Sequence, residues 1–271
     1  MRTEIKEIVL EGQVTGPAKL IGYILDSISV APDKKRPAVI ICPGGGYSRK
    51  SDRESEPIAM QFLSMGCHAF IMDYSVAPSY FPTAVRELAE AVAIVREHGE
   101  QWQVDTSRII VTGFSAGGHL ACSLGVFWNQ PMVYDALGRE AAEVRPDGMI
   151  LAYPVITGGP FRHEGSFEML LGEEATQKDR DQVSLENFVS EKTPKAFIWH
   201  TVTDDAVPVE SSLLLASAMR KHNVNFEMHI YPAGCHGLSL ASEETGGTDQ
   251  RLNEPQCQSW ISLVKTWIAN F

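Results

Sequence analysis

A serine between glycines is the residue of this chain best placed to act as a nucleophile. Ser115 lies in the sequence Gly-Phe-Ser-Ala-Gly at residues 113–117, directly after a mainly apolar stretch at residues 108–112. The glycines permit a sharp turn from a strand into a helix, and such a turn exposes the serine hydroxyl. The helix expected from Ala116 onward would aim its N-terminus at the same point. Helices that begin with small residues also occur in nucleotide-binding folds. The residues around this turn must therefore distinguish a nucleophile from simple close packing.

A run of three glycines further upstream can donate backbone amides to that point. Residues 44–46 are glycines and follow an apolar stretch at residues 37–42. Because glycine has no side chain to block a close approach, the amides of Gly45 and Gly46 can turn toward one negative oxygen. We expect them to form an oxyanion hole together with the amide of Ala116. A glycine loop can also bind phosphate, but this loop has neither the G-x-G-x-x-G pattern nor a following Gly-Lys-Ser/Thr.

Two adjacent carboxylates are candidates for the acid that orients a catalytic base. Asp204 and Asp205 follow an apolar stretch at residues 195–201, and Pro208 comes after them with a predicted helix behind it. A carboxylate in this position can hold an imidazole in one tautomer and stabilise its charged form. The residues alone leave the choice between the two open. We expect the neighbour that is not used to cap the helix or to face solvent.

His236 is the candidate base. It follows the predicted strand at residues 225–231 and lies between Gly234 and Gly237, which leave room around its ring. The order serine, aspartate, histidine along the chain, with each residue after its own strand, is that of a Ser-Asp-His triad in a parallel sheet. We therefore predict that Ser115, Asp204 or Asp205, and His236 meet at one edge of that sheet.

Other residues near these motifs have weaker claims. Tyr47, which ends the glycine loop, and His163 are candidate substrate contacts. His119 and His200 fall on a helix and at a strand end, where we expect structural roles. No histidine spacing such as H-E-x-x-H points to a metal. We expect neither a metal nor a cofactor.

The elements that must position these residues alternate between strands and helices, which predicts a mostly parallel sheet covered on both faces. An antiparallel start is expected at residues 7–10 and 20–29. Further strands are predicted at residues 37–42, 67–74, 109–111, 148–153, 195–201 and 225–231. Helices are predicted at residues 56–65, from 82 to just before 99, from 116 onward, and at 209–222 and 255–269.

Residues 156–191 interrupt this alternation. The segment is polar, contains Gly-Gly-Pro at residues 158–160 and lies between two predicted strands. A connection of this length is more often a lid or a binding insertion than filler, although a surface insertion without function remains an alternative. We expect short helices in it at residues 166–171 and 178–183.

Composition narrows the class of protein. The chain has 271 residues, 44% of them hydrophobic, which suits one large α/β domain, although two small domains would also fit. The net charge of −11 disfavours binding to nucleic acid or to anionic membranes. No apolar run approaches the length of a membrane span, and the first residues lack the apolar core of a secretory signal. These features favour a small-molecule partner and leave a homo-oligomer open.

The cysteines favour a reduced, cytoplasmic protein. There are five, an odd number, and no two have C-x-x-C spacing. Most lie in apolar runs, where a thiol behaves as a small hydrophobic group. Cys235 precedes His236, but nothing else about it indicates a nucleophile.

With these motifs in place, the chain resembles the α/β hydrolases, and among them the bacterial esterases related to hormone-sensitive lipase and to acetylxylan esterases. The likeness extends over residues 36–271. It is carried by residues 43–47 (Pro-Gly-Gly-Gly-Tyr), 73–78, 81–82, 113–118, 204–208 and 236–237. The resemblance implies an α/β-hydrolase fold over residues 1–271, with a short lid at residues 156–191.

The resemblance also implies roles for individual residues. Its D-x-x-x-P motif selects Asp204 over Asp205 as the acid. Its first loop usually reads His-Gly-Gly-Gly, and Pro43 stands here in place of the histidine; the amides of Gly45 and Gly46 should serve all the same. The large N-terminal cap of that family is missing, which argues against long acyl chains.

Together these features predict a serine carboxylesterase that acts on small acyl esters, acetyl esters of carbohydrates above all. A peptidase of the same fold is the nearest enzymatic alternative, since it would share the serine motif. A non-catalytic small-molecule binder built on this fold is the alternative of another class.

Overall fold

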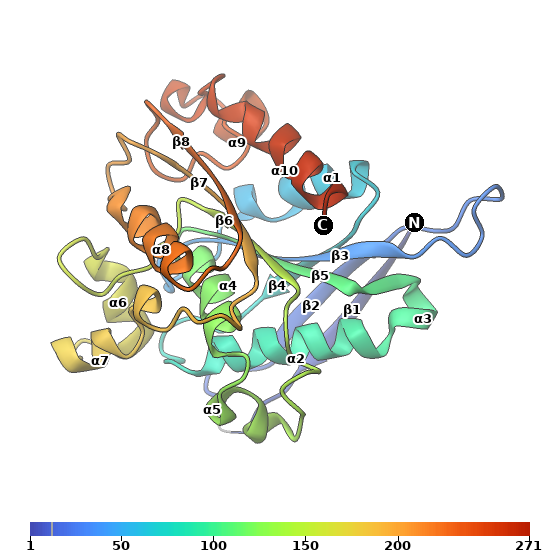
Figure 1. Cartoon of the computed structure of the whole chain (residues 1–271), viewed down its shortest axis with the longest axis horizontal. Coiled ribbons are helices and arrows are strands. Elements are labelled where there is room, and N and C mark those ends of the chain that lie inside the picture. The colour runs from blue at the N-terminus through green and yellow to red at the C-terminus, as the bar shows by residue number, and fades with distance from the viewer. Residues whose placement is uncertain (12) are drawn as a thin grey trace.

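The computed structural model describes residues 1–11 and 13–271, and these residues form an eight-stranded sheet (Figure 1). The strand order is β1-β2-β4-β3-β5-β6-β7-β8. β1, β2 and β4 pair antiparallel, and every later pair is parallel. The strands are β1 (Arg2–Ile8), β2 (Ala18–Ile24), β3 (Arg36–Cys42), β4 (His68–Asp73), β5 (Val104–Phe114), β6 (Gly148–Ala152), β7 (Lys195–Thr201) and β8 (Phe226–Tyr231).

Helices cover both faces of this sheet, and Figure 1 shows α2 and α4 on one side and α1 and α10 on the other. The α-helices are α1 (Glu56–Ser64), α2 (Thr83–Glu97), α3 (Gly99–Trp102), α4 (Ala116–Phe127), α5 (Pro131–Tyr134), α6 (Glu164–Leu171), α7 (Gln177–Asp181), α8 (Glu210–Lys221), α9 (Glu243–Gly246) and α10 (Trp260–Ala269). Short 3-10 turns lie at Asp52–Glu54, Asp135–Leu137, Leu185–Asn187, Gln250–Leu252 and Cys257–Ser259.

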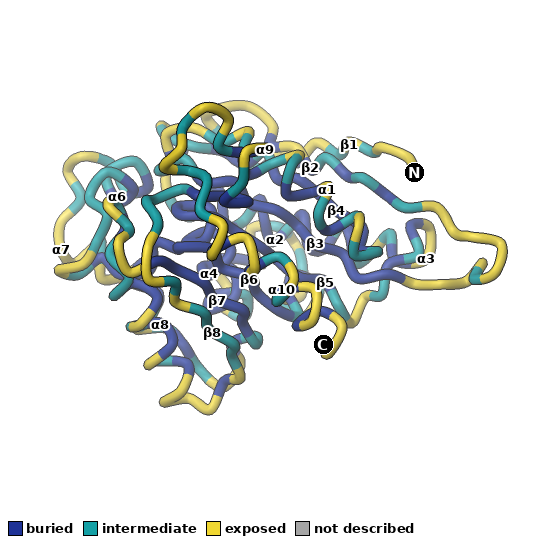
Figure 2. The backbone as a smooth tube through the Cα atoms, turned by 90° about the horizontal axis from the view of Figure 1, so that it is seen from above, coloured by how far each residue is buried: buried dark blue, intermediate teal, exposed yellow. Residues whose placement is uncertain are grey.

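The core divides into two layers, one on each side of the sheet. One cluster packs residues of α2, α4 and α8 against the sheet, and the other packs α1 and α10 against its opposite face. The central strands are therefore buried on both sides, as the dark blue segments in the middle of Figure 2 show. All seven residues of β3 are buried, which explains why its sequence is continuously apolar after Arg36 instead of alternating.

The predicted alternation of strands and helices is confirmed for the core, with differences at its margins. The two N-terminal strands, Arg2–Ile8 and Ala18–Ile24, both begin and end earlier than expected, and the exposed residues of β1, the edge strand, carry little apolar signal. β5 runs from Val104, well before the predicted residues 109–111. The C-terminal α-helix begins at Trp260 instead of residue 255.

The insertion at residues 156–191 contains two short helices close to the predicted ones. α6 begins at Glu164, two residues before the expected start, and α7 ends at Asp181. A capping box explains the start of α7: Thr176 accepts a hydrogen bond from the amide of Asp179, and the Asp179 carboxylate accepts one from the amide of Thr176. Sequence periodicity did not indicate the single-turn helices α3, α5 and α9, which are too short to show it.

Within the described residues no helix is both long and apolar enough to cross a bilayer. All five cysteines are unpaired, and four of them are buried.

Candidate active site

Ser115 occupies a strained turn between β5 and α4. Its φ of 54° and ψ of −119° are unusual for a residue with a side chain. The turn also requires its two glycines. A Cβ at Gly113 would lie 2.0 Å from the carbonyl oxygen of Gly117, and a Cβ at Gly117 would lie 2.1 Å from that of Cys42. The backbone packing around the turn therefore fixes where the hydroxyl points.

The structure brings Ser115, His236 and Asp204 together in one hydrogen-bonded line. Nε2 of His236 lies 2.7 Å from Oγ of Ser115, and Nδ1 lies 2.8 Å from Oδ2 of Asp204. The Ser115 residue is 7% exposed, whereas the His236 side chain is 20% exposed. Because Nδ1 faces a carboxylate, it carries the proton, and Nε2 is free to accept one from the serine hydroxyl.

Asp204 is buried, yet its surroundings favour the ionised form. Burial alone would raise the pKa of Asp204, but hydrogen bonds from His200 and His236 lower it well below the ordinary value. Oδ1 also accepts hydrogen bonds from the amides of Ala206 and Val207, at 3.0 and 2.8 Å. A carboxylate held by so many donors remains a fixed negative charge beside the imidazole.

Asp205 has a different task from the one expected of it. Its Oδ1 accepts a hydrogen bond from the backbone amide of His236 at 2.9 Å, so it neither caps a helix nor merely faces solvent. Asp204 therefore orients the ring of His236, and its neighbour anchors the backbone of the same residue. This arrangement agrees with the choice of Asp204.

The glycine loop after β3 holds backbone amides beside Ser115. Gly45 and Gly46 adopt positive φ values of 131° and 65°. Within the described residues their amides have no hydrogen-bond acceptor, whereas the amide of Gly44 donates to Oε2 of Glu54 at 2.8 Å. Ala116 is the first residue of α4, so its amide has no partner inside the helix either.

Glu54 ties this loop to the loop that carries His236. Its Oε1 accepts a 2.6 Å hydrogen bond from the hydroxyl of Tyr153, which itself accepts one from the amide of Ser239 at 2.8 Å. Burial and the nearby Glu54 charge raise the pKa of Tyr153 well above its ordinary value, so the phenol stays protonated and donates. The Tyr153 ring also lies edge-on to the ring of His236, with centroids 5.2 Å apart.

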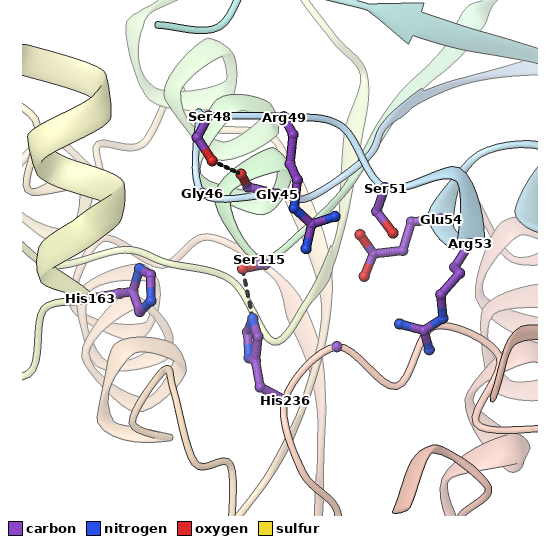
Figure 3. A pocket seen from close by; sticks show the side chains of 11 residues that line it. Gly45, Gly46, Ser48, Arg49, Ser51, Arg53, Glu54, Ser115, His163 and His236 are labelled. Atoms are coloured by element: carbon purple, nitrogen blue, oxygen red, sulfur yellow. Dashed lines mark hydrogen bonds between the residues drawn. The ribbon is translucent and has the colours of Figure 1, made fainter. Parts of the chain in front are cut away.

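A cavity of about 380 Å³ opens over Ser115 (Figure 3). Figure 3 places His163 on one side of Ser115 and Arg49, Glu54 and Arg53 on the other. The residues that line the cavity are Gly45, Gly46, Ser48, Arg49, Ser51, Arg53, Glu54, Ser115, His163, His236 and Gly237. This lining contains no aliphatic side chain and no phenylalanine, tyrosine or tryptophan.

His163, a predicted substrate contact, lies in the lining of the cavity. It caps α6, where its Nδ1 accepts a hydrogen bond from the amide of Ser166 at 3.2 Å. Burial, and to a lesser extent the charge of His236, lowers the pKa of His163. The neutral ring therefore carries its proton on Nε2, as a hydrogen-bond donor.

Tyr47, the other predicted substrate contact, is not part of the lining. It is 3% exposed, and its hydroxyl lies 2.9 Å from Nδ1 of His119 beneath the glycine loop. The prediction for Tyr47 is wrong because the side chain turns into the core from a residue with a φ of 58°. His119 and His200 are completely buried and hydrogen-bonded, in agreement with structural roles.

The charged residues of the cavity were not predicted from the sequence. Arg49, Arg53 and Glu54 follow the glycine loop and resemble an ordinary polar surface turn. Their position directly after an oxyanion-type loop was the available signal. Cys235 points away from this cavity's lining, with its thiol against the carbonyl of Arg251. Among the described residues no group of three or more His, Cys, Asp or Glu side chains is arranged to hold a metal ion.

The model of the BD-FAE family matches residues 28–219, which is more than half of the chain. The chain belongs to the BD-FAE family. Its fold is that of the α/β hydrolases, as the sequence resemblance implied. A solved acetyl ester-xyloside bifunctional hydrolase from Caldicellulosiruptor lactoaceticus is 36% identical, with a TM-score of 0.82 over 98% of this chain and 96% of that one. The carboxylesterase Cest-2923 from Lactobacillus plantarum WCFS1 is 28% identical, with a TM-score of 0.86 over 100% of this chain and 98% of that one.

Curated relatives of this BD-FAE chain are longer proteins. The endo-1,4-beta-xylanase B of Butyrivibrio fibrisolvens is 36% identical over 221 residues, which are 78% of this chain and 34% of that protein. The acetylxylan esterase of Xylanibacter ruminicola is 30% identical over 211 residues, which are 76% of this chain and 42% of that protein. The chain thus spans less than half the length of either relative.

Replacing each aspartate by asparagine should separate their two tasks. Asp204→Asn can keep the bonds to the amides of Ala206 and Val207, but it presents an N–H to Nδ1 of His236 and favours the wrong tautomer. We expect kcat for ester hydrolysis to fall by about 10³ to 10⁴. Asp205→Asn keeps a carbonyl oxygen for the amide of His236 and should cost less than about tenfold. Steady-state kinetics of both variants test this, and the reverse ranking would contradict the assignment.

Glu54→Gln should break the connection that Glu54 makes between the two loops. One oxygen of the carboxylate becomes an amino group, so either Gly44 or Tyr153 loses its acceptor inside the protein. We expect the free energy of unfolding to fall by about 1–3 kcal/mol and kcat to fall more than KM rises. Glu56→Gln is the matched control, because the exposed Glu56 only accepts a hydrogen bond from Tyr23. Urea unfolding and steady-state kinetics of both variants test this prediction. Equal effects of the two substitutions would show that the Glu54 network does not position the loops of the site.

Proposed function

We propose that this protein is a serine carboxylesterase that removes short acyl groups, acetyl above all, from polar alcohols such as carbohydrates. One observation carries the proposal: the hydrogen-bonded Ser115 and His236 open into a cavity lined only by glycines and polar side chains. The names of relatives support it, because one is an acetylxylan esterase and another is an acetyl ester-xyloside hydrolase.

Acylation begins with attack by Oγ of Ser115 on the ester carbonyl carbon, while its proton moves to Nε2 of His236. Asp204 stabilises the imidazolium that forms. The carbonyl oxygen becomes negative and accepts hydrogen bonds from the amides of Gly45, Gly46 and Ala116. When the tetrahedral intermediate collapses, the carbon–oxygen bond to the alcohol breaks, and His236 returns the proton to that oxygen.

Deacylation repeats these steps with water. His236 accepts a proton from a water molecule, whose oxygen attacks the acyl carbon. The same amides stabilise the second oxyanion. Collapse breaks the bond to Oγ of Ser115, which takes its proton back from His236 as the free acid leaves. No cofactor enters this scheme.

The polar lining limits the acyl chain. A methylene gains about 0.8 kcal/mol only where it leaves water for an apolar surface. The lining has no aliphatic side chain and no phenylalanine, tyrosine or tryptophan, so a longer tail finds no continuous apolar wall and must displace water from charged groups.

The same lining suits a hydroxylated alcohol. Nε2 of His163 is available as a donor from one side of the cavity, and serine hydroxyls line it elsewhere. α6, which His163 caps, belongs to the insertion at residues 156–191, so this segment acts as the lid over the leaving alcohol.

Removing the nucleophile should abolish hydrolysis and leave the fold intact. We expect Ser115→Ala to lower kcat for 4-nitrophenyl acetate by about 10⁴ to 10⁶. Ser123→Ala, a buried serine further along α4, is the control and should keep its rate. A fluorophosphonate probe should label the wild type and not the Ser115 variant. Failure to label the wild type would favour a non-catalytic binder, and full activity of Ser115→Ala would contradict the mechanism.

Acyl length should separate this enzyme from a lipase. We expect kcat/KM to be highest for two- and three-carbon esters and to fall by about tenfold or more at eight carbons, since each added methylene finds no apolar surface. The measurement uses 4-nitrophenyl esters of two, four, eight and twelve carbons, below their solubility limits. A value of kcat/KM that climbs steadily to twelve carbons would overturn the short-acyl assignment.

A further inference from the structure

Two arginines give one end of the cavity a positive charge that the proposed ester hydrolysis does not use. Arg49 and Arg53 lie beyond Ser115 on the side opposite to His163 (Figure 3). Nη1 of Arg53 lies 4.0 Å from the position of a Cβ on Gly237, so the guanidinium reaches the wall next to the catalytic histidine. Short-acyl hydrolysis of a neutral ester needs no cation at this place.

Neither arginine has a carboxylate partner within 4 Å among the described residues, although the protein has an excess of eleven negative charges. Several other arginines are paired, as Arg139 is with Glu90 and Arg162 with Glu164, whereas Arg36, Arg86 and Arg220 bind carbonyl or amide oxygens. In Arg53, Nε donates to the carbonyl of Thr245, while Nη2 is buried without an acceptor in the described part of the chain. Because Nη2 has no accessible surface, a ligand can reach this guanidinium only through Nη1, which also has no acceptor among the described residues.

The one carboxylate in the cavity lining does not supply that acceptor. Glu54 is 3% exposed, and its two oxygens accept hydrogen bonds from Gly44 and Tyr153. Asp204, behind His236, is bound by His200, His236 and two backbone amides. Both negative charges are thus engaged by other donors.

The backbone of Arg49 is fixed relative to the oxyanion amides. Its amide donates to the carbonyl of Gly45 at 3.2 Å, in the turn that closes the glycine loop. Position 45 must be glycine, because a Cβ there would lie 2.2 Å from the carbonyl oxygen of Arg49. The guanidinium therefore starts from a defined point near the reacting carbonyl, which reduces the entropy lost on binding.

We infer that the natural substrate is an ester that carries a carboxylate close to the ester bond, and that Arg49 binds this carboxylate with Arg53 in support. A guanidinium can bind a carboxylate through two parallel hydrogen bonds, which also sets its orientation. This inference rests on the proposed esterase function and adds its substrate class.

Pairs of probes that differ in charge but not in shape test it. For the alcohol side, 4-acetoxybenzoate is compared with 4-acetoxybenzamide. For the acyl side, the 4-nitrophenyl monoester of fumaric acid is compared with the 4-nitrophenyl ester of fumaramic acid, because the trans double bond keeps the carboxylate from attacking its own ester. We expect the wild type to prefer the anionic member of one pair by about 10- to 100-fold in kcat/KM, as for a hydrogen bond between charged groups. The pair that shows the preference identifies the half of the ester that bears the carboxylate.

Substitution of Arg49 tests whether this residue causes the preference for the anionic probe. Arg49→Gln should remove most of it, so that the anionic and neutral members of the pair react at similar rates, because only the anion loses a partner. Arg49→Lys, which keeps the charge, should restore part of it, and Arg53→Gln should have a smaller effect. Arg220→Gln, an exposed arginine of α8 far along the chain, is the control and should leave both rates unchanged. Equal losses on anionic and neutral probes would indicate a structural role for Arg49 and overturn the inference.

A binding measurement separates this inference from the esterase function. The Ser115→Ala protein does not turn substrate over, so calorimetry can compare its affinity for 4-acetoxybenzoate and 4-acetoxybenzamide. Tighter binding of the acid that Arg49→Gln abolishes would support the carboxylate site even if the wild type hydrolysed no ester. Hydrolysis of the neutral ester without any preference for the acid, in rate or in binding, would leave the esterase function standing and refute the carboxylate site.

Discussion

The close packing of backbone around Ser115 is the constraint on which the rest of the site depends. The carbonyl group of Cys42 lies so close to Gly117 that no side chain would fit there, and the carbonyl group of Gly117 lies equally close to Gly113. The turn therefore forms only with glycine at both positions. The amide of Ser115 donates to the carbonyl of Ala152, and its carbonyl accepts from the amide of Val155. β3, β5 and β6 must therefore end at one level of the sheet. The strained serine is held there because a core packed on both faces opposes its relaxation.

A buried carboxylate, that of Glu54, holds the loops around Ser115 in fixed positions relative to one another. Glu54 lies on a short 3-10 turn, yet it joins the amide of Gly44 to Tyr153 at the end of β6 and, through the phenol, to Ser239. Loops after parallel strands are otherwise free to move independently. Here one buried network links the amides proposed to bind the oxyanion to the segment just after His236. A buried charge is tolerated in such a place only because each oxygen has a strong donor.

The sequence predicted the parts of the site that depend on backbone and missed those that depend on side-chain direction. Glycine spacing around Ser115 and the order of Ser115, Asp204 and His236 reflect strand ends, which hydrophobic patterns locate well. Tyr47 was misplaced because its orientation follows from a positive φ that its sequence does not announce. Arg49 and Glu54 look alike in sequence, as polar residues of one turn. Only folding separates them, since the arginine stays exposed and the carboxylate is buried.

One end of the cavity is positively charged, whereas the whole molecule is negatively charged. The distance between a ligand and these charges decides which of them acts on it more strongly. The net charge of −11 is spread over the surface, and salt at physiological strength screens such charges beyond about 8 Å. Inside the cavity, Arg49 and Arg53 lie near the ester, while Glu54 and Asp204 are held by their own donors. A small anion that has passed the entrance is therefore governed by the guanidinium groups and not by the overall charge. A long polyanion, whose charges would extend over the acidic surface, gains no such advantage, so the cavity favours short acidic ligands.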